Sequence, residues 1–304
     1  MTTIQSILRE QGYILADGAM GTMLFSAGLE NGGSPELWNI EAPDIVGKVH
    51  QGYLDAGAQI LLTNTFGGNR YRLALHGLEA QVGELNRAAT RLLRQIVEVS
   101  VRQALVAGDI GPSGGVMTPY GEMSFEEARD AFAEQAVGLI EGGVDLIWIE
   151  TMADLKEARA AYEGVRQVSA EIPIISTMTF DTRGRTMMGV TPEQAASELL
   201  SFGSVAVGGN CGNGPEEIIG VVEKMHATAP AAILTAKANA GIPELVGGKV
   251  VYRASPEMMG EYAVSAFNAG ARIIGACCGS TPEHIRVIAT SLATLAPVSI
   301  DLPA

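Results

Sequence analysis

Residues 204–217, with the sequence SVAVGGNCGNGPEE, contain the unit on which the fold prediction rests. The apolar run 204–210 is typical of a strand that is buried on both faces. Gly214-Pro215-Glu216 marks a helix start, because Pro has no amide to lose at the first helical position and Glu lies at the positive end of the helix dipole. A strand, a glycine-rich turn and a helix in this order predict one repeat of a parallel α/β sheet.

The same unit recurs along the chain. Short runs rich in Val, Ile and Leu leave room for one helix each, and they cover residues 13–17, 59–64, 104–110, 145–150, 172–178, 204–210, 231–237 and 271–276. Eight strand and helix pairs in 304 residues predict a single (β/α)8 barrel, a TIM barrel, that forms one domain over residues 1–304. A doubly wound open sheet is the alternative fold.

Several helix starts carry their own signals. Thr191, Ser255 and Thr281 each precede a Pro-Glu pair, as a capping residue does. Two capping boxes are expected, in which a capping side chain and an acid three residues later satisfy each other's backbone amides. They are Ser124 with Glu127 and Asp154 with Glu157.

The charge and the hydropathy narrow the classes of partner. A formal net charge of -14 repels phosphate backbones, so nucleic acid and anionic membranes are poor partners. No apolar run approaches the length of about 18 residues that a membrane span needs, and residues 1–5 lack the pattern of a secretory signal. We therefore expect a cytoplasmic protein. Its oligomeric state stays open, and a homo-oligomer is compatible with a barrel, because barrels associate through outer helices.

Polar and thiol groups collect at the predicted carboxyl ends of the strands, where barrel enzymes carry their active sites. These groups are Asp17, Asn64, Asp109, Glu150, Cys211, Asn239 and the pair Cys277-Cys278. They predict one functional rim.

The three cysteines of the chain, Cys211, Cys277 and Cys278, predict a zinc site on that rim. Three thiolates are one ligand short of the tetrahedron that Zn²⁺ prefers, and soft sulfur suits the open position. A thiol that bound there would lose its proton, so alkylation of a thiol is the predicted chemistry. Two alternatives stay open: three small buried cysteines, or a non-enzymatic zinc or thiol protein in which Cys277 and Cys278 form a vicinal pair.

Seven ordered segments resemble the zinc-dependent homocysteine S-methyltransferase family, which includes the homocysteine module of cobalamin-dependent methionine synthase and bacterial proteins similar to betaine-homocysteine methyltransferase. The segments are LADGAMGT (15–22), TNTFG (63–67), GDIGP (108–112), IET (149–151), GNCG (209–212), NAG (239–241) and the stretch 275–283. They extend over nearly the whole chain. The resemblance implies a methyltransferase that makes methionine from homocysteine and a methyl donor.

The resemblance also implies a role for each matching residue. Cys211, Cys277 and Cys278 would bind zinc and act in catalysis, with the homocysteine sulfur as the fourth ligand. Asn239 would fill the open position when substrate is absent, although a turn-forming Asn is an equal alternative. The remaining expected substrate contacts are Glu150 and Asp17 to the ammonium, the backbone amides of Gly18, Ala19 and Thr22 to the carboxylate, and Asn64 and Thr65 in the pocket wall. Glu150 would also be catalytic, with a helix-capping acid as its alternative role.

The methyl donor is less well specified. Trp38 and Phe66 are candidate walls of an aromatic cage for betaine, a quaternary ammonium compound. However, Gly67 and Gly68 follow Phe66, and Thr151 follows Glu150, which departs from animal betaine enzymes and favours the methionine synthase module. The sequence has no Asp-x-His-x-x-Gly segment, so a methylcorrinoid would arrive on a partner protein. Betaine is the close alternative, and S-methylmethionine is the third possible donor.

Lys237 offers a different chemistry. It lies near the end of the seventh predicted strand, where a lysine of a barrel aldolase could form a Schiff base. That interpretation leaves the three cysteines unexplained, and the methyltransferase is therefore preferred.

Overall fold

Eight parallel strands close into a barrel in the computed structural model, which describes residues 3–30, 32–247 and 249–295. The sheet has the order β1-β10-β7-β6-β5-β4-β3-β2, and a parallel bridge between Ala16 and Ile60 joins its two ends. The strands are β1 (Ile14–Leu15), β2 (Ile60–Leu62), β3 (Leu105–Ile110), β4 (Leu146–Met152), β5 (Ile174–Met178), β6 (Ala206–Cys211), β7 (Leu234–Ala238) and β10 (Ala271–Ala276). The predicted (β/α)8 barrel is confirmed, and the open sheet is wrong.

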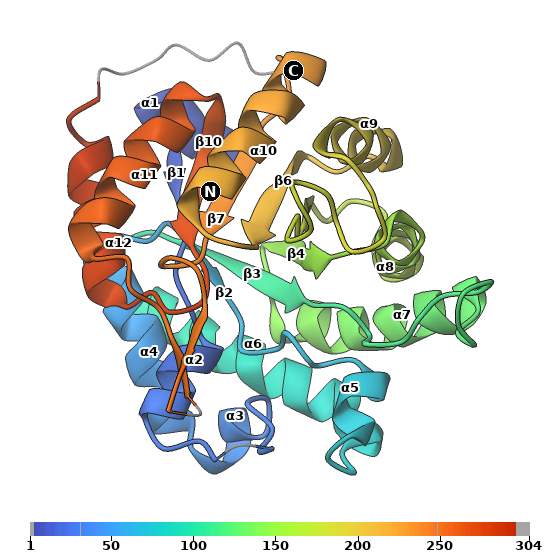
Figure 1. Cartoon of the computed structure of the whole chain (residues 1–304). Helices are drawn as coiled ribbons and strands as arrows, with labels where there is room; N and C mark the ends of the chain where they lie inside the picture. The colour runs from blue at the N-terminus through green and yellow to red at the C-terminus, as the bar shows by residue number, and fades with distance from the viewer. Residues whose placement is uncertain (1–2, 31, 248, 296–304) are drawn as a thin grey trace.

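Helices follow the strands and surround the barrel (Figure 1). They are α1 (Ile4–Gln11), α2 (Gly21–Ser26), α3 (Trp38–Glu41), α4 (Pro43–Ala56), α5 (Arg70–Ala74), a 3-10 helix (Glu79–Gln81), α6 (Val82–Val99), α7 (Phe125–Gly142), α8 (Leu155–Val168), α9 (Pro192–Phe202), α10 (Pro215–Thr228), α11 (Pro256–Asn268) and α12 (Pro282–Leu292). None of these helices, which are those of the described ranges, is both long and apolar enough to cross a membrane.

The predicted helix starts are largely confirmed. Thr191 and Ser255 cap α9 and α11, and Ser124 and Glu127 form the expected capping box of α7. Asp154 caps α8 by accepting a hydrogen bond from the amide of Lys156, but Glu157 does not complete a capping box. The Glu157 carboxylate instead accepts hydrogen bonds from the amide and the hydroxyl of Ser113 in the loop after β3.

Two apolar layers hold the barrel together. Inside the barrel, strand residues such as Trp148, Ile175 and Ile273 form one cluster with Ile7 and Leu8 of α1. Helix α1 covers the amino-terminal end of the barrel. A larger layer fills the space between the strands and the surrounding helices. The carboxyl end of the barrel therefore remains for the site.

One element was not predicted. Between β7 and α11, β8 (Glu244–Val246) and β9 (Lys249–Val251) pair as an antiparallel hairpin. The side chains of Glu244, Leu245, Val246 and Val250 are exposed, with Leu245 77% accessible. The hairpin lies among the loops that follow the barrel strands.

Candidate active site

A cavity of about 480 Å³ opens at the carboxyl ends of the strands. Residues of the loops after β1 and β2 form much of its wall. Its polar and thiol lining consists of Asp17, Thr22, Asn64, Asp109, Glu150, Thr151, Lys237, Cys211, Cys277 and Cys278, together with Glu36, Thr63, Arg72 and His76. The structure thus gathers most of the predicted rim into one space.

The three cysteines form a cluster at this cavity. The Sγ atoms of Cys277 and Cys211 are 3.6 Å apart, and those of Cys211 and Cys278 are 3.9 Å apart. All three Sγ atoms lie within 4.8 Å of one another. Thiolates at about 2.3 Å from one tetrahedral Zn²⁺ are about 3.8 Å from each other. The cluster therefore fits a single metal ion that has a fourth position to fill.

The backbone around the cysteines explains the glycines that frame them. Cys211 has a φ of 63°, which is uncommon for a residue with a side chain, and Gly212 continues the left-handed turn at 68°. Gly279 has a φ of 79°, and a Cβ on it would lie only 2.2 Å from the ring of Tyr252. Glycine is therefore required where the chain leaves Cys278.

The thiols of the free cluster cannot all be ionised together. Hydrogen bonds from Cys211 and Cys277 lower the pKa of Cys278 to about 3, whereas its hydrogen bonds to Cys277 and Cys278 raise the pKa of Cys211. The charges of the neighbouring sulfurs thus oppose ionisation of all three thiols at once. A bound cation favours ionisation of all three sulfurs.

A buried group of charges lies in the same cavity. Nζ of Lys237 donates to Oδ1 of Asp17 at 2.9 Å, and it lies 5.0 Å from the centre of the Trp148 ring. Although burial alone would lower the pKa of Lys237, the carboxylates of Asp17 and Glu150 raise it. Lys237 is therefore held as a cation, which does not suit a Schiff-base nucleophile.

Two carboxyl groups in the cavity have spare hydrogen-bonding capacity. Within the described part of the chain, Oε2 of Glu150 and Oδ1 of Asp109 are buried without a hydrogen-bond partner. Burial raises the pKa of Glu150 to about 8, and burial followed by the charge of Glu150 raises that of Asp109 well above its usual range. Both groups would be stabilised as carboxylates by a cationic ligand.

The turn after β1 is held from outside the cavity. The amide of Ala19 donates to Oγ of Ser280 at 3.0 Å, and the hydroxyl of Tyr53 donates to the Ala19 carbonyl at 2.7 Å. A Cβ on Gly18 would lie 2.5 Å from Oγ of Ser280, so the close approach requires glycine. Thr22 accepts a hydrogen bond from the amide of Gly279, which connects this turn to the Cys277-Cys278 segment.

The other predicted pocket residues differ in position. Asn64 lines the cavity and its amide donates to the Pro35 carbonyl at 2.7 Å. Thr65 lies behind the lining, where its hydroxyl donates to the Asp109 carbonyl at 2.8 Å. Asn239 donates to the Gly212 carbonyl at 2.8 Å, and its buried Oδ1 has no partner among the residues described. Asn239 thus supports the Cys211 turn and keeps a free acceptor.

From the sequence, Asp109 was placed on the functional rim without a specific role, and Tyr53 and Ser280 were not singled out. Asp109 was recognisable as an acid at a strand end, whereas Tyr53 belongs to the outer helix α4 and gave no signal. Contacts between segments far apart in the chain, as between Ala19 and Ser280, become visible only in the fold.

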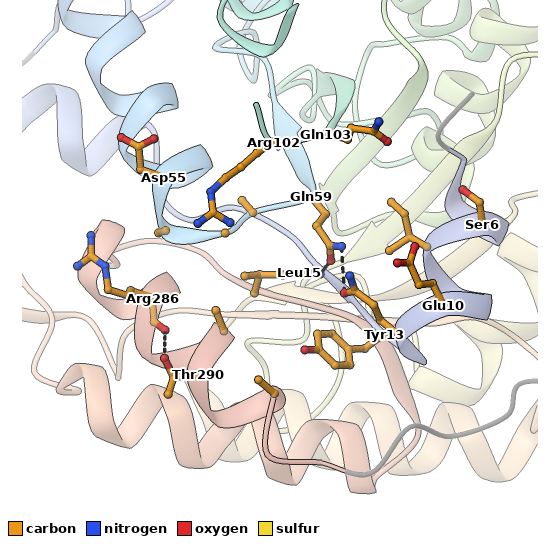
Figure 2. Close-up of a pocket in the computed structure, with 17 residues that line it drawn as sticks. Ser6, Glu10, Tyr13, Leu15, Asp55, Gln59, Arg102, Gln103, Arg286 and Thr290 are labelled. Carbon is orange, nitrogen blue, oxygen red and sulfur yellow. Dashed lines mark hydrogen bonds between the residues drawn. The ribbon is translucent and has the colours of Figure 1, made fainter. Parts of the chain in front are cut away.

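A second cavity, of about 1060 Å³, lies at the amino-terminal end of the barrel (Figure 2). Its wall comes from α1, the starts of β1 to β3 and the end of α12. Glu10, Asp55, Arg102 and Arg286 are exposed there and carry mixed charges. This open hollow lacks the converging thiols and buried acids of the other end.

Comparison with known proteins agrees with this site. The chain is 32% identical over 302 residues to methionine synthase of Mycobacterium leprae, and 32% identical over 304 residues to that of Mycobacterium tuberculosis. The alignments include 93% and 94% of this chain but only 24% and 25% of the relatives. The chain thus spans about a quarter of the length of these curated relatives.

Solved structures show the same fold. The metallated form of the homocysteine methyltransferase MmuM from Escherichia coli has a TM-score of 0.80 at 24% identity, and covers 94% of this chain and 99% of its own. Its oxidized form has a TM-score of 0.78 at 25% identity, with coverage of 95% and 99%. A sequence model of homocysteine S-methyltransferases matches residues 14–292. The chain belongs to the homocysteine S-methyltransferase family.

Proposed function

We propose that this protein is a zinc-dependent homocysteine S-methyltransferase that produces methionine. The observation that carries the proposal is the cluster of Cys211, Cys277 and Cys278, which is one ligand short of a tetrahedron and opens on the cavity that holds Glu150 and Asp109. A thiol ligand and a cationic ammonium would complete both parts of the site. Homocysteine has both groups.

Cys211, Cys277 and Cys278 would hold the metal as thiolates. Zinc, when bound, supplies a fourth position at which the thiol of homocysteine loses its proton and is kept as a nucleophile. At neutral pH a free thiol with a pKa of about 8.5 is only a few per cent ionised, so this coordination favours reaction. Asn239, whose Oδ1 is free of protein partners in the described ranges, is the proposed occupant of the position before substrate binds.

The remaining residues would orient the amino acid part of the substrate. We assign the ammonium to Glu150, with Asp17 beside it, because the cavity has more buried acids than bases. The Asp17 carboxylate already accepts hydrogen bonds from Lys237 and from the Leu62 amide. Asp17 would therefore attract the substrate ammonium through its negative charge and contact it through its backbone. The substrate carboxylate would lie against the turn of Gly18, Ala19 and Thr22, with Asn64 in the wall. The Ala19 amide already donates to Ser280, so the contribution of Ala19 is to shape the turn and not to donate to the carboxylate.

Methyl transfer then needs a donor in line with the sulfur. The homocysteine sulfur forms a bond to the methyl carbon, and the bond from that carbon to the donor breaks with its electron pair staying on the donor. We propose a methylcorrinoid on a partner protein as the donor, within a methylfolate-linked system. The likeness to methionine synthases supports the choice of this donor over betaine.

Betaine is the second candidate donor, and dimethylglycine would be its product. Phe25 and Phe66 line the cavity and offer aromatic faces to a quaternary ammonium. Trp38, the other candidate cage wall, belongs to α3 and lies outside the cavity lining that the described residues form. The aromatic cage therefore lacks one of the two walls that the sequence predicted, which favours the corrinoid as the donor.

A donor comparison tests the proposal. The zinc-loaded protein is incubated with homocysteine and, separately, betaine, S-methylmethionine, free methylcobalamin or a methylated corrinoid protein, and methionine is measured. We expect methionine in a corrinoid reaction and none when homocysteine is omitted. Methionine from betaine alone would overturn the donor assignment, and its absence with every donor would count against the activity.

A further inference from the structure

The strand that carries Glu150 leaves its regular pairing next to that residue. Ile149 of β4 pairs with Ser176 of β5, but the next recorded pair is Met152 with Met178, so β4 contains one extra residue. Such a bulge redirects side chains and leaves backbone groups without ladder partners. Thr151 lies in this bulge with a φ of 60°, in the left-handed region that a β-branched residue rarely adopts.

The side chain of Asn210 holds this bulge in place from β6. Its Oδ1 accepts a hydrogen bond from the Thr151 amide at 2.8 Å, and its Nδ2 donates to the Thr151 hydroxyl at 2.6 Å. Oδ1 also accepts from the hydroxyl of Thr177 on β5 at 2.8 Å. Asn210 is fully buried, and its three side-chain hydrogen bonds go to β4 and β5. It thus satisfies the amide that the bulge releases.

Asn210 is also the residue before Cys211, which has the unusual φ of 63°. One residue therefore connects, through its side chain, to the backbone next to Glu150 and, through its backbone, to a cysteine of the cluster. Both connected positions have strained backbones that persist only where the surroundings fix them. The distance between the ammonium site and the metal site depends on this connection.

We propose that Asn210 is a positioning residue that fixes Glu150 relative to the cysteine cluster, and so gives the site its selectivity for a thiol that also carries an ammonium group. This inference rests on the proposed function, because the ammonium belongs to homocysteine. Asn210 itself has no contact with the reacting atoms. Its loss should weaken the ammonium site and leave the metal site able to bind a simple thiol.

The test compares two thiols on the zinc-loaded protein by calorimetry. Homocysteine carries the ammonium, and 4-mercaptobutanoate is the same molecule without it. In Asn210→Ala, the dissociation constant for homocysteine should rise about tenfold, as expected for leaving a buried amide unsatisfied beside the binding group. The constant for 4-mercaptobutanoate should change less than about twofold, with the zinc content retained, because that ligand makes no contact with Glu150.

Two further variants make the comparison specific. Glu150→Gln should show the same loss of preference for homocysteine, which would place both residues in one function. Ser204→Ala is the matched control, because it breaks the buried 2.9 Å hydrogen bond between the hydroxyls of Ser204 and Ser176, near the other end of the barrel. It should keep the preference of the unaltered protein.

The outcomes separate the two ideas. If the unaltered protein binds neither thiol, the proposed function fails. If it prefers homocysteine and Asn210→Ala keeps that preference in full, the role of Asn210 is wrong. A variant that loses affinity for both thiols to the same extent would also overturn it, since that result indicates general damage to the site.

Discussion

At the scale of single residues, Glu150 gives the site a dependence on pH. Burial raises its pKa from 4.5 to about 8, so between these values the folded protein binds this proton more tightly than the unfolded chain does. The contribution of Glu150 to folding stability therefore decreases as the pH rises through this range. Binding of an ammonium requires the opposite form, the carboxylate.

We therefore predict that the preference for homocysteine over 4-mercaptobutanoate increases as the pH rises from about 6 to about 8 and then levels off. Ionisation of the thiol is common to both ligands and cancels in the ratio of their dissociation constants. Calorimetry across this range measures the ratio, with Glu150→Gln as the control that should give a flat profile. A flat profile in the unaltered protein would show that Glu150 does not bind the ammonium.

The site residues also show how far prediction from sequence extends. Cys211, Cys277 and Cys278 were assigned to one cluster because they follow the sixth and eighth predicted strands, whose carboxyl ends lie near each other on the rim of a barrel. The structure brings their sulfurs together, with β7 between the two strands. The support given by Asn210 was missed, since a buried Asn in an apolar strand has no sequence signature that names its partner. Its bonds to Thr151 depend on a bulge that the regular strand pattern hides.

At the scale of elements, the ion pair between Lys237 of β7 and Asp17 after β1 joins two parts of the barrel that lie on either side of β10. Both side chains are almost fully buried, with 3% and 4% accessible. Lys237→Met should lower the free energy of unfolding by about 3–5 kcal/mol, because it leaves the Asp17 charge buried without its partner.

Urea unfolding at neutral pH measures this change. Exposed Arg159, which pairs with Glu163 on α8, provides the matched control, and Arg159→Met should cost less than about 1 kcal/mol. Equal effects of the two substitutions would show that the buried pair has no special role in joining the strands.

Prediction of the elements succeeded where a local signal existed. Thr191 and Ser255 cap their helices as expected, because a cap needs only its neighbours in sequence. Glu157 failed as part of a capping box because Ser113, from a distant loop, competes for its carboxylate. The hairpin of β8 and β9 did have a signal in the sequence, the pair Gly247-Gly248 between Leu245-Val246 and Lys249-Val250-Val251. It was passed over because eight strands had already been assigned to the barrel.

At the scale of the whole molecule, the fold gathers the cysteines and the buried acids at the carboxyl end of the barrel. Helix α1 covers the amino-terminal end of the barrel, while the cavity with the cysteines and the buried acids opens at the carboxyl end. Family membership decides against the non-enzymatic zinc or thiol protein that the sequence alone left open. In the function that we propose, the homocysteine sulfur completes the metal site at this end of the barrel.

Zinc X-ray absorption spectroscopy of the intact protein with and without homocysteine tests this claim directly. We expect about one zinc per chain, bound by three sulfurs and one lighter atom, with a change to four sulfurs when homocysteine is added. Cys277→Ala is the control, and it should lose the zinc. An unchanged zinc environment on addition of homocysteine, or full zinc retention in Cys277→Ala, would show that the homocysteine sulfur does not complete a metal site at these cysteines.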